Sequence, residues 1–254
     1  MKKLLKTLIL CFPLVGVAQD FSRWQIGLNF NPYNFSRQNE VFSAYKDKTN
    51  LINGIGFGIT LEKQFGILGL KTGIEYTFEN SNHTLTFQLP VNDTKIKSSF
   101  NFIKMPLLCQ YYIGINENLT ISLSQGIQLL YLNNYKTIMD NGDFNYWVYE
   151  NNTVTYTSVY NGQLPIIYSD ASIHKKFNIG LKGAAGIKYF VTDNISISNN
   201  LMYEYDLSNS DDWPSYPFIS SNNKTNDIRH LRLGLELGIQ YHYDKFIKFN
   251  KNPK

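Results

Sequence analysis

Apolar residues recur at every second position in several stretches of the chain. The clearest stretch is 230–243, HLRLGLELGIQYHY, where Leu, Ile and Tyr occupy every odd-numbered position from Leu231 to Tyr243. The even-numbered positions carry charged, polar or small residues, including Arg232 and Glu236. Successive residues of a strand point to opposite faces of a sheet, so the pattern predicts a strand with one apolar and one polar face.

The same alternation, in weaker form, is present in seven further segments. They lie at 24–30, 54–62, 68–78, 102–113, 119–131, 177–189 and 195–207. No helical periodicity separates them. The sequence therefore predicts an all-β chain with eight antiparallel strands.

The connections between these segments alternate in length. Short links occupy 63–67, 114–118 and 191–194, whereas long polar links occupy 32–50, 79–98, 133–173 and 208–228. In an up-and-down arrangement, all the long links fall at one end of the sheet and all the short links at the other. This asymmetry is typical of outer-membrane barrels, which have short periplasmic turns and long external loops.

The longest link contains its own pair of alternating segments, FNYWVYE and TVTYTSVY, which flank Asn151 and Asn152. We interpret the pair as a hairpin that projects beyond the membrane; a ten-stranded barrel is the alternative. Its aromatic side chains are the candidate external contact surface: Tyr146, Trp147, Tyr149, Tyr156 and Tyr160. The alternative role for these rings is to pack the hairpin against neighbouring loops.

Aromatic residues gather at both ends of the apolar face, while the middle of each segment is mostly aliphatic. Trp24 and Tyr189 lie at the short-link end, and Tyr131 and Tyr203 lie at the long-link end. Amphipathic rings favour the two interfaces of a membrane. A soluble, lipocalin-like barrel with an inward apolar face would carry more charge on its outer face. The pattern thus favours a single eight-stranded antiparallel transmembrane β-barrel.

The opposite, mixed face then points into the lumen. Nine charged residues on it are predicted to form a polar network: Glu62, Lys71, Glu75, Lys104, Lys182, Lys188, Glu204, Arg232 and Glu236. An eight-stranded barrel is just wide enough for its side chains to fill. Buried charges are costly without partners, so we expect an ion-paired plug rather than a water-filled pore. A narrow channel or transport accessory is the alternative.

The first 18 residues have the features of a secretory signal peptide. A basic start precedes an apolar stretch, and Gly16 and Ala18 suit a cleavage site after Ala18. The expected organisation is a signal peptide at 1–18, a barrel domain at 19–243 and a Lys-rich tail at 244–254.

Processing also changes the charge and the thiol content of the chain. Without the three leader lysines, the 24 Lys and Arg fall to 21, against 20 Asp and Glu. This balance gives no indication of nucleic-acid binding. Only Cys109 remains of the two cysteines, which excludes a disulfide within the mature chain.

Two segments carry a family resemblance. FIKMPLLCQYYIG, at 102–114, and NIGLKGAAGIKYFVTDNISIS, at 178–198, resemble strands of the PorT-type outer membrane β-barrel family of Bacteroidetes. The resemblance implies a bacterial outer-membrane location and supplies no catalytic residues. Its motifs are packing motifs.

The sequence has no G-x-S-x-G or H-E-x-x-H motif. Asp170, His174, Asp211 and Asp212 fall in the long links, where a rim-active enzyme would need them, but spacing alone establishes no site. We therefore predict a non-enzymatic protein without cofactor or metal. Its expected partners are outer-membrane lipid and, through the loops, other envelope proteins or an external ligand.

Overall fold

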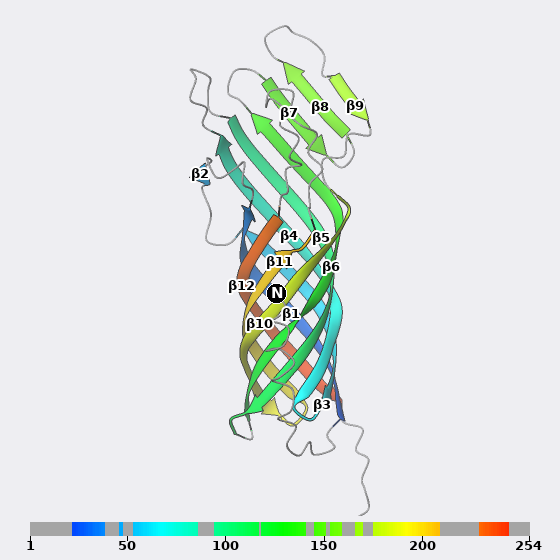
Figure 1. Cartoon of the computed structure of the whole chain (residues 1–254), viewed down its shortest axis with the longest axis vertical. Helices are drawn as coiled ribbons and strands as arrows, with labels where there is room; N and C mark the ends of the chain where they lie inside the picture. Colours follow the sequence, from blue (N-terminus) through cyan, green and yellow to red (C-terminus); the bar gives the residue numbers. More distant parts are fainter. Residues whose placement is uncertain are drawn as a thin grey trace, which may run out of the picture.

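Eight long strands form a closed antiparallel barrel in the computed structural model (Figure 1). The structure describes residues 22–38, 46–47, 53–85, 94–116, 118–140, 145–150, 153–158, 166–169, 175–208 and 229–243. The barrel strands are β1 (Ser22–Gln38), β3 (Gly54–Phe65), β4 (Leu68–Leu85), β5 (Thr94–Gly114), β6 (Leu119–Asp140), β10 (Phe177–Thr192), β11 (Ile195–Asp206) and β12 (Arg229–Tyr243). Among the described residues, no helix has the length and hydropathy needed to cross a membrane.

The ring closes because β6 pairs with β10 and β12 pairs with β1. One row of register partners runs once around the barrel and returns to β1 at Asn34, ten residues beyond its start at Trp24. The row is Trp24, Lys63, Leu70, Cys109, Gln125, Gly183, Tyr203, Leu233 and Asn34. Eight strands with this stagger enclose an interior that side chains can fill. The eight-stranded prediction is confirmed, and the ten-stranded alternative is wrong.

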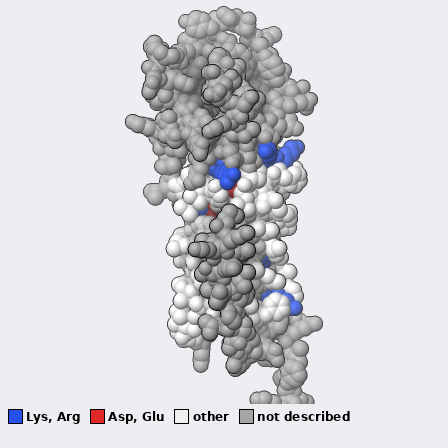
Figure 2. Space-filling model, viewed as in Figure 1, with Lys and Arg blue, Asp and Glu red and all other residues white. Residues whose placement is uncertain are grey.

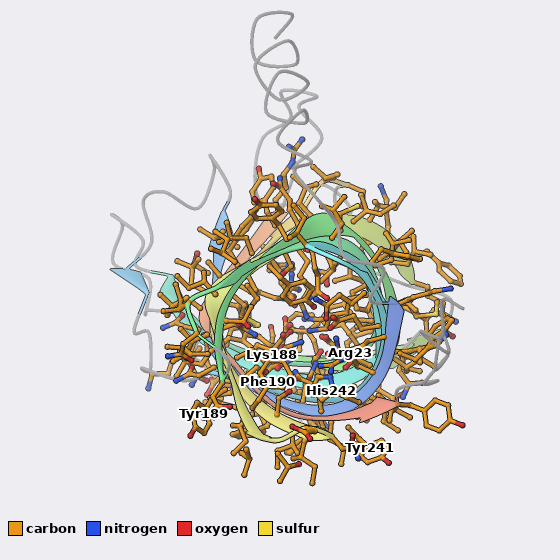
Figure 3. The ribbon with its side chains drawn as sticks, turned by 90° about the horizontal axis from the view of Figure 1, so that it is seen from below. Arg23, Lys188, Tyr189, Phe190, Tyr241 and His242 are labelled. Atoms are coloured by element: carbon orange, nitrogen blue, oxygen red, sulfur yellow. The ribbon has the colours of Figure 1, made fainter. Side chains whose placement is uncertain are left out.

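The outer face of the barrel is a broad apolar band. Leu28, Ile74 and Leu201 are 65%, 61% and 70% exposed, although residues of this kind are normally buried. On the face drawn in Figure 2, most of the described surface carries no charge, and Lys and Arg form only isolated groups. Figure 3 shows Tyr189 and Tyr241 outside the ring near its short-turn end, as expected for an interfacial aromatic belt. This band suits contact with hydrocarbon.

The strands continue further at the long-loop end than the sequence predicted. The end of the apolar alternation predicts loops at 79–98 and 133–173, but β4 continues to Leu85 and β6 to Asp140. In this part of β4 the exposed Asn80 alternates with the buried Glu79, so both faces are polar. Strands β4, β5 and β6 stay paired in this region, although the apolar alternation that predicts a strand has ended.

A β-bulge at Asn133 separates the two parts of β6. Phe102 is opposite Leu132, whereas Asn101 is opposite Asn134, so Asn133 is the additional residue on β6. Below the bulge, odd-numbered β6 residues such as Leu129 face outward; above it, Tyr135 is buried and Lys136 is exposed. Bulges of this kind are frequent at barrel rims, where they bend a strand and reverse its faces.

Three short strands enlarge the sheet above the barrel. β7 (Asn145–Glu150) pairs with the end of β6, β8 (Thr153–Ser158) pairs with β7, and β9 (Ile166–Ser169) pairs with β8. β2 (Lys46–Asp47) pairs with β4. We call β7, β8 and β9, together with the ends of β4, β5 and β6 at 79–85, 94–101 and 134–140, the sheet extension; it rises from one side of the barrel (Figure 1). The predicted hairpin is present as β7 and β8.

Glycines on the lumen face allow the strands to curve tightly. A Cβ atom added to Gly126 would lie 2.0 Å from the backbone oxygen of Leu107 on β5, and one added to Gly73 would lie 2.3 Å from the backbone oxygen of Ile59 on β3. These are contacts with backbone, which cannot rotate away. Gly114, at the end of β5, has no atom within 4 Å of the same position.

We therefore expect Gly126→Ala to lower the free energy of unfolding by about 1–3 kcal/mol, as overpacking does elsewhere. The measurement is urea unfolding of the refolded protein, followed by the gel-mobility difference between unboiled and boiled samples. Gly114→Ala is the matched control and should stay within about 0.5 kcal/mol of the parent. Equal effects of the two substitutions would contradict the close-approach explanation.

Candidate functional site

The lumen holds a continuous network of buried ion pairs, which is the main concentration of chemically reactive groups in the described part of the chain. At its centre, the Nζ atom of Lys182 on β10 lies 2.6 and 2.8 Å from the two carboxylate oxygens of Glu75 on β4. The same Nζ lies 3.4 Å from Glu204 on β11 and 3.6 Å from Glu236 on β12. One ammonium group thereby joins four strands.

The network continues toward the long-loop end through Lys104 and Arg232. Lys104 on β5 lies 2.7 Å from Glu204 and 3.3 Å from Glu79. Arg232 donates to both oxygens of Glu79, at 2.6 and 3.1 Å, and donates a further bond of 2.7 Å to Asp206. Bidentate guanidinium–carboxylate pairs are strong and fix the relative orientation of the two groups.

Toward the short-turn end, the pairs become less direct. Lys71 donates to Glu236 at 2.7 Å, which connects it to the central group. Lys188 donates to Gln25 at 2.8 Å and lies 3.6 Å from Glu62, which accepts a hydrogen bond from the Tyr112 hydroxyl. Viewed from below, Lys188 and His242 lie inside the ring (Figure 3).

An aromatic layer lies above the charges. Phe35 and Phe100 contact the ring of His230, with centroids 5.8 and 6.1 Å away. Phe102 faces the guanidinium of Arg232, whose Cζ is 5.5 Å from the ring centroid. All three phenylalanines are buried. They limit solvent access to the upper part of the network, where charge interactions are then screened less.

The structure brings all nine predicted lumen residues into the interior, each no more than 4% exposed. Six buried carboxylates face five buried Lys and Arg side chains among the described residues, and His230 lies 2.9 Å from the sixth carboxylate, Asp206. The pairs join neighbouring strands, as between Arg232 on β12 and Asp206 on β11, and also strands that do not pair with each other, as between Lys182 on β10 and Glu75 on β4. Lys71, for example, is opposite Glu62 in the register but bonds to Glu236.

Sequence reasoning missed four members of this site. The sequence predicts a loop at Glu79 because the outward apolar residues end at Phe78. The predicted network does not include Asp206 and His230. Tyr33, whose hydroxyl donates to Glu79 at 2.8 Å, was placed in the link at 32–50. Strand parity was the available signal: Glu79 shares parity with Glu75, and Asp206 shares parity with Glu204.

The structure describes the backbone, but not the side chains, of four of the five candidate contact residues. Tyr146, Trp147 and Tyr149 lie on β7 and Tyr156 lies on β8, with the backbone of Trp147 paired to those of Met139 and Tyr156. The structure describes the strands but not these side chains. Tyr160 lies outside the described residues, as do the rim residues Asp170, His174, Asp211 and Asp212, the expected leader 1–18 and the tail 244–254.

Within the described ranges, no group of three or more His, Cys, Asp or Glu side chains is placed to hold a metal ion. His230 and His242 are both buried and lie near opposite ends of β12. The geometry therefore supports structural ion pairing in the lumen, and the prediction of a protein without metal or catalytic centre is not tested by it.

Comparison with known families gives one broad match. The family described as "Outer membrane protein beta-barrel domain" matches residues 17–212 of this chain. No curated protein matches the sequence.

Solved structures of outer-membrane proteins are similar to the chain at low identity. Neisserial surface protein A is 14% identical, with a TM-score of 0.40, covering 88% of this chain and 100% of its own. Ail, the attachment invasion locus protein of Yersinia pestis, is 14% identical, with a TM-score of 0.38 and coverages of 89% and 100%. The outer membrane protease OmpT from Escherichia coli is 9% identical, with a TM-score of 0.40 and coverages of 91% and 99%. At these scores none of the three carries an argument about function.

The central ion pairs predict a large effect when one partner is removed. Lys182→Met should lower the free energy of unfolding by about 3–5 kcal/mol, because it leaves Glu75 buried without its nearest cation. Lys136→Met is the control, since Lys136 and its partner Glu150 are 49% and 50% exposed; it should cost no more than about 1 kcal/mol.

Adding Glu75→Leu to Lys182→Met should recover part of the loss, because the unpaired carboxylate is then gone. Urea unfolding measures all three variants. A double variant as unstable as Lys182→Met alone would show that the lost stability comes from packing rather than from the uncompensated charge.

Proposed function

Because the chain belongs to the outer membrane β-barrel domain family, we propose that it is a non-conducting scaffold that holds a binding surface outside the outer membrane. The barrel anchors the chain in lipid, and the sheet extension with its adjoining loops meets the partner. The partner is another envelope protein or an external ligand. Two features of the barrel support the proposal. Paired charges occupy its lumen, and strands β4, β5 and β6 continue beyond the apolar band into the sheet extension.

The filled lumen supports the non-conducting part of the proposal. Contacts cross the barrel at several heights: Lys188 to Gln25, Lys182 to Glu75, and Arg232 to Glu79. An ion entering this interior would have to displace charge-assisted hydrogen bonds that have no aqueous replacement nearby. Charged rings that conduct ions instead leave an open path between their side chains.

The sheet extension supports the binding part. Its described outer face is polar, with Ser99 bonded to Asn80 at 2.7 Å and Lys136 bonded to Glu150 at 3.1 Å. Its β7–β8 hairpin contributes the Tyr and Trp positions predicted as a contact surface. Tyr and Trp provide large contact area at low entropic cost, and Asn and Ser provide adaptable hydrogen bonds.

Three finer assignments belong to the same proposal. We assign the chain to the PorT-type subgroup on the segments at 102–114 and 178–198, and we place signal-peptide cleavage after Ala18. We also infer that the protein is not an enzyme, because His230 and Asp206 are each only 1% exposed and Asp206 is held by both His230 and Arg232.

Reconstitution into a planar bilayer tests the closed lumen. The folded protein should give no steady single-channel current, whereas a porin inserted by the same procedure should give discrete steps. The reason is the continuous set of contacts across the lumen. Reproducible conductance steps that scale with the amount of folded protein would contradict the non-conducting assignment.

Cysteine labelling on intact cells tests the orientation. Lys136→Cys and Asn116→Cys, each in a Cys109→Ser background, place a thiol on the sheet extension and in a short turn, at positions that are both exposed. A membrane-impermeant maleimide should label Cys at 136 on intact cells and Cys at 116 only after lysis. The reverse pattern would mean that the sheet extension faces the periplasm.

A further inference from the structure

Lys188 differs from the other buried lysines of the described lumen in having no carboxylate close to its ammonium group. Each of the others has a carboxylate oxygen within 2.7 Å: Lys71, Lys104 and Lys182. The closest acceptor of Lys188 is the amide oxygen of Gln25, at 2.8 Å, whereas Glu62 is 3.6 Å away. Because Lys188 is only 3% exposed, water screens its charge little. An additional anion beside Lys188 would therefore be stabilising.

Arg23 and His242 face the same part of the lumen. Figure 3 shows both inside the ring with Lys188, near the short-turn end. Arg23 lies on β1, two residues before the inward-facing Gln25, and His242 lies near the end of β12. Electrostatic interactions reach the His242 ring from both Lys188 and Arg23. Arg23 and Phe190 are partly exposed, so solvent reaches this end of the lumen.

The hydrogen bonds around His242 fix the position of its proton. Nε2 of Gln240 donates to Ser198 at 2.8 Å, so Oε1 is the Gln240 atom that accepts from the Ser196 hydroxyl, at 2.9 Å. Ser196 has a single proton to give, and it therefore accepts, at 2.7 Å, the proton of His242 Nε2. A second proton, on Nδ1, would place a third positive charge beside the two cations. The ring is therefore neutral, and its Nδ1 is an acceptor.

This acceptor is buried without a donor. His242 is 1% exposed, and its Nδ1 has no hydrogen-bond partner among the described residues. The ring of Phe190 packs against the imidazole, with the ring centroids 5.0 Å apart. A buried acceptor that has lost water and gained no donor is destabilising. The site therefore combines two cations, which attract an anion, with a lone pair that requires a proton donor.

We propose that the short-turn end of the lumen binds a phosphate group that retains a P–OH, such as inorganic phosphate. Its charged oxygens accept from Lys188 and Arg23, and its P–OH donates to Nδ1 of His242. Sulfate, which has the same shape, carries no proton at neutral pH and would turn a charged oxygen toward the lone pair. A phosphodiester, such as a phospholipid head group, also lacks the P–OH. The site faces the periplasm only if the orientation proposed above is correct, whereas phosphate binding itself does not depend on it.

A comparison of phosphate with sulfate on the unmodified chain tests the site. The full chain is refolded in detergent micelles in a buffer free of both anions, and titration calorimetry follows each anion in turn. We expect one saturable site for inorganic phosphate. Its affinity should exceed that for sulfate or dimethyl phosphate at least roughly tenfold, because each of these leaves the Nδ1 acceptor unpaired. Phosphate should also raise the urea midpoint of unfolding more than sulfate does.

Arg23→Gln and His242→Phe separate the two parts of the site. Loss of the Arg23 charge should weaken phosphate and sulfate binding alike, roughly tenfold. His242→Phe removes the lone pair and should abolish the preference for phosphate over sulfate. Lys136→Met removes an exposed cation of the sheet extension and is the control, which should bind phosphate as the parent does. The mobility difference between unboiled and boiled samples verifies that each variant has folded.

Three results would overturn the proposal. The first is the absence of saturable phosphate binding to the folded parent. The second is equal affinity of the parent for phosphate and for sulfate or the diester, which would leave no role for Nδ1. The third is an unchanged phosphate affinity in folded Arg23→Gln, which would place the anion elsewhere. The first two use only the parent chain, so they apply even where a variant does not fold, and none depends on the conductance or labelling results.

Discussion

The structure depends on the requirement that every backbone polar group in a hydrocarbon environment be paired within the protein. The pairing of β6 with β10 meets this requirement by leaving no open sheet edge around the apolar band. Closure with eight strands and a stagger of ten residues then sets the width of the lumen. The width determines the remaining problem, because the inward side chains are numerous, polar and cut off from bulk water.

The charge network supplies partners for these inward polar side chains. Isolated charges could not remain ionised in so narrow an interior, and a purely apolar filling would remove the inside–outside alternation that separates the lumen from the lipid face. Long Lys and Arg side chains reach across the lumen to carboxylates on other strands. Lys104, Lys182 and Arg232 each contact carboxylates from at least two strands, so the network connects opposite sides of the barrel.

The strands of the barrel could be predicted from the sequence because the alternation of apolar and polar residues is a local property of each strand. Odd-numbered positions of β12 and the aromatic ends of the segments identified both the strands and the lipid face. The ion-pair partners could not be obtained in the same way. Lys182 and Glu75 are 107 residues apart, and which carboxylate a lysine reaches depends on barrel radius and stagger, not on spacing in the sequence. Glu79 and Tyr33 were missed for a related reason, since the apolar alternation ends before the strands do.

The bulge at Asn133 shows how one local irregularity connects the apolar band of the barrel to the sheet extension. Below it, Tyr131 and Leu129 belong to the lipid face; above it, the next outward residues are Asn134 and Lys136. A regular strand would keep odd-numbered residues outward and would turn Tyr135 toward solvent. The additional residue instead buries Tyr135 in one cluster with Phe100, its register partner on β5, and turns polar side chains outward above the apolar band. Strand β6 can therefore continue as the base of the β7–β9 sheet without exposing an apolar face to water. The lumen network and the sheet extension thus meet on β4, where Glu79 begins the extension and is bonded to Arg232 in the network.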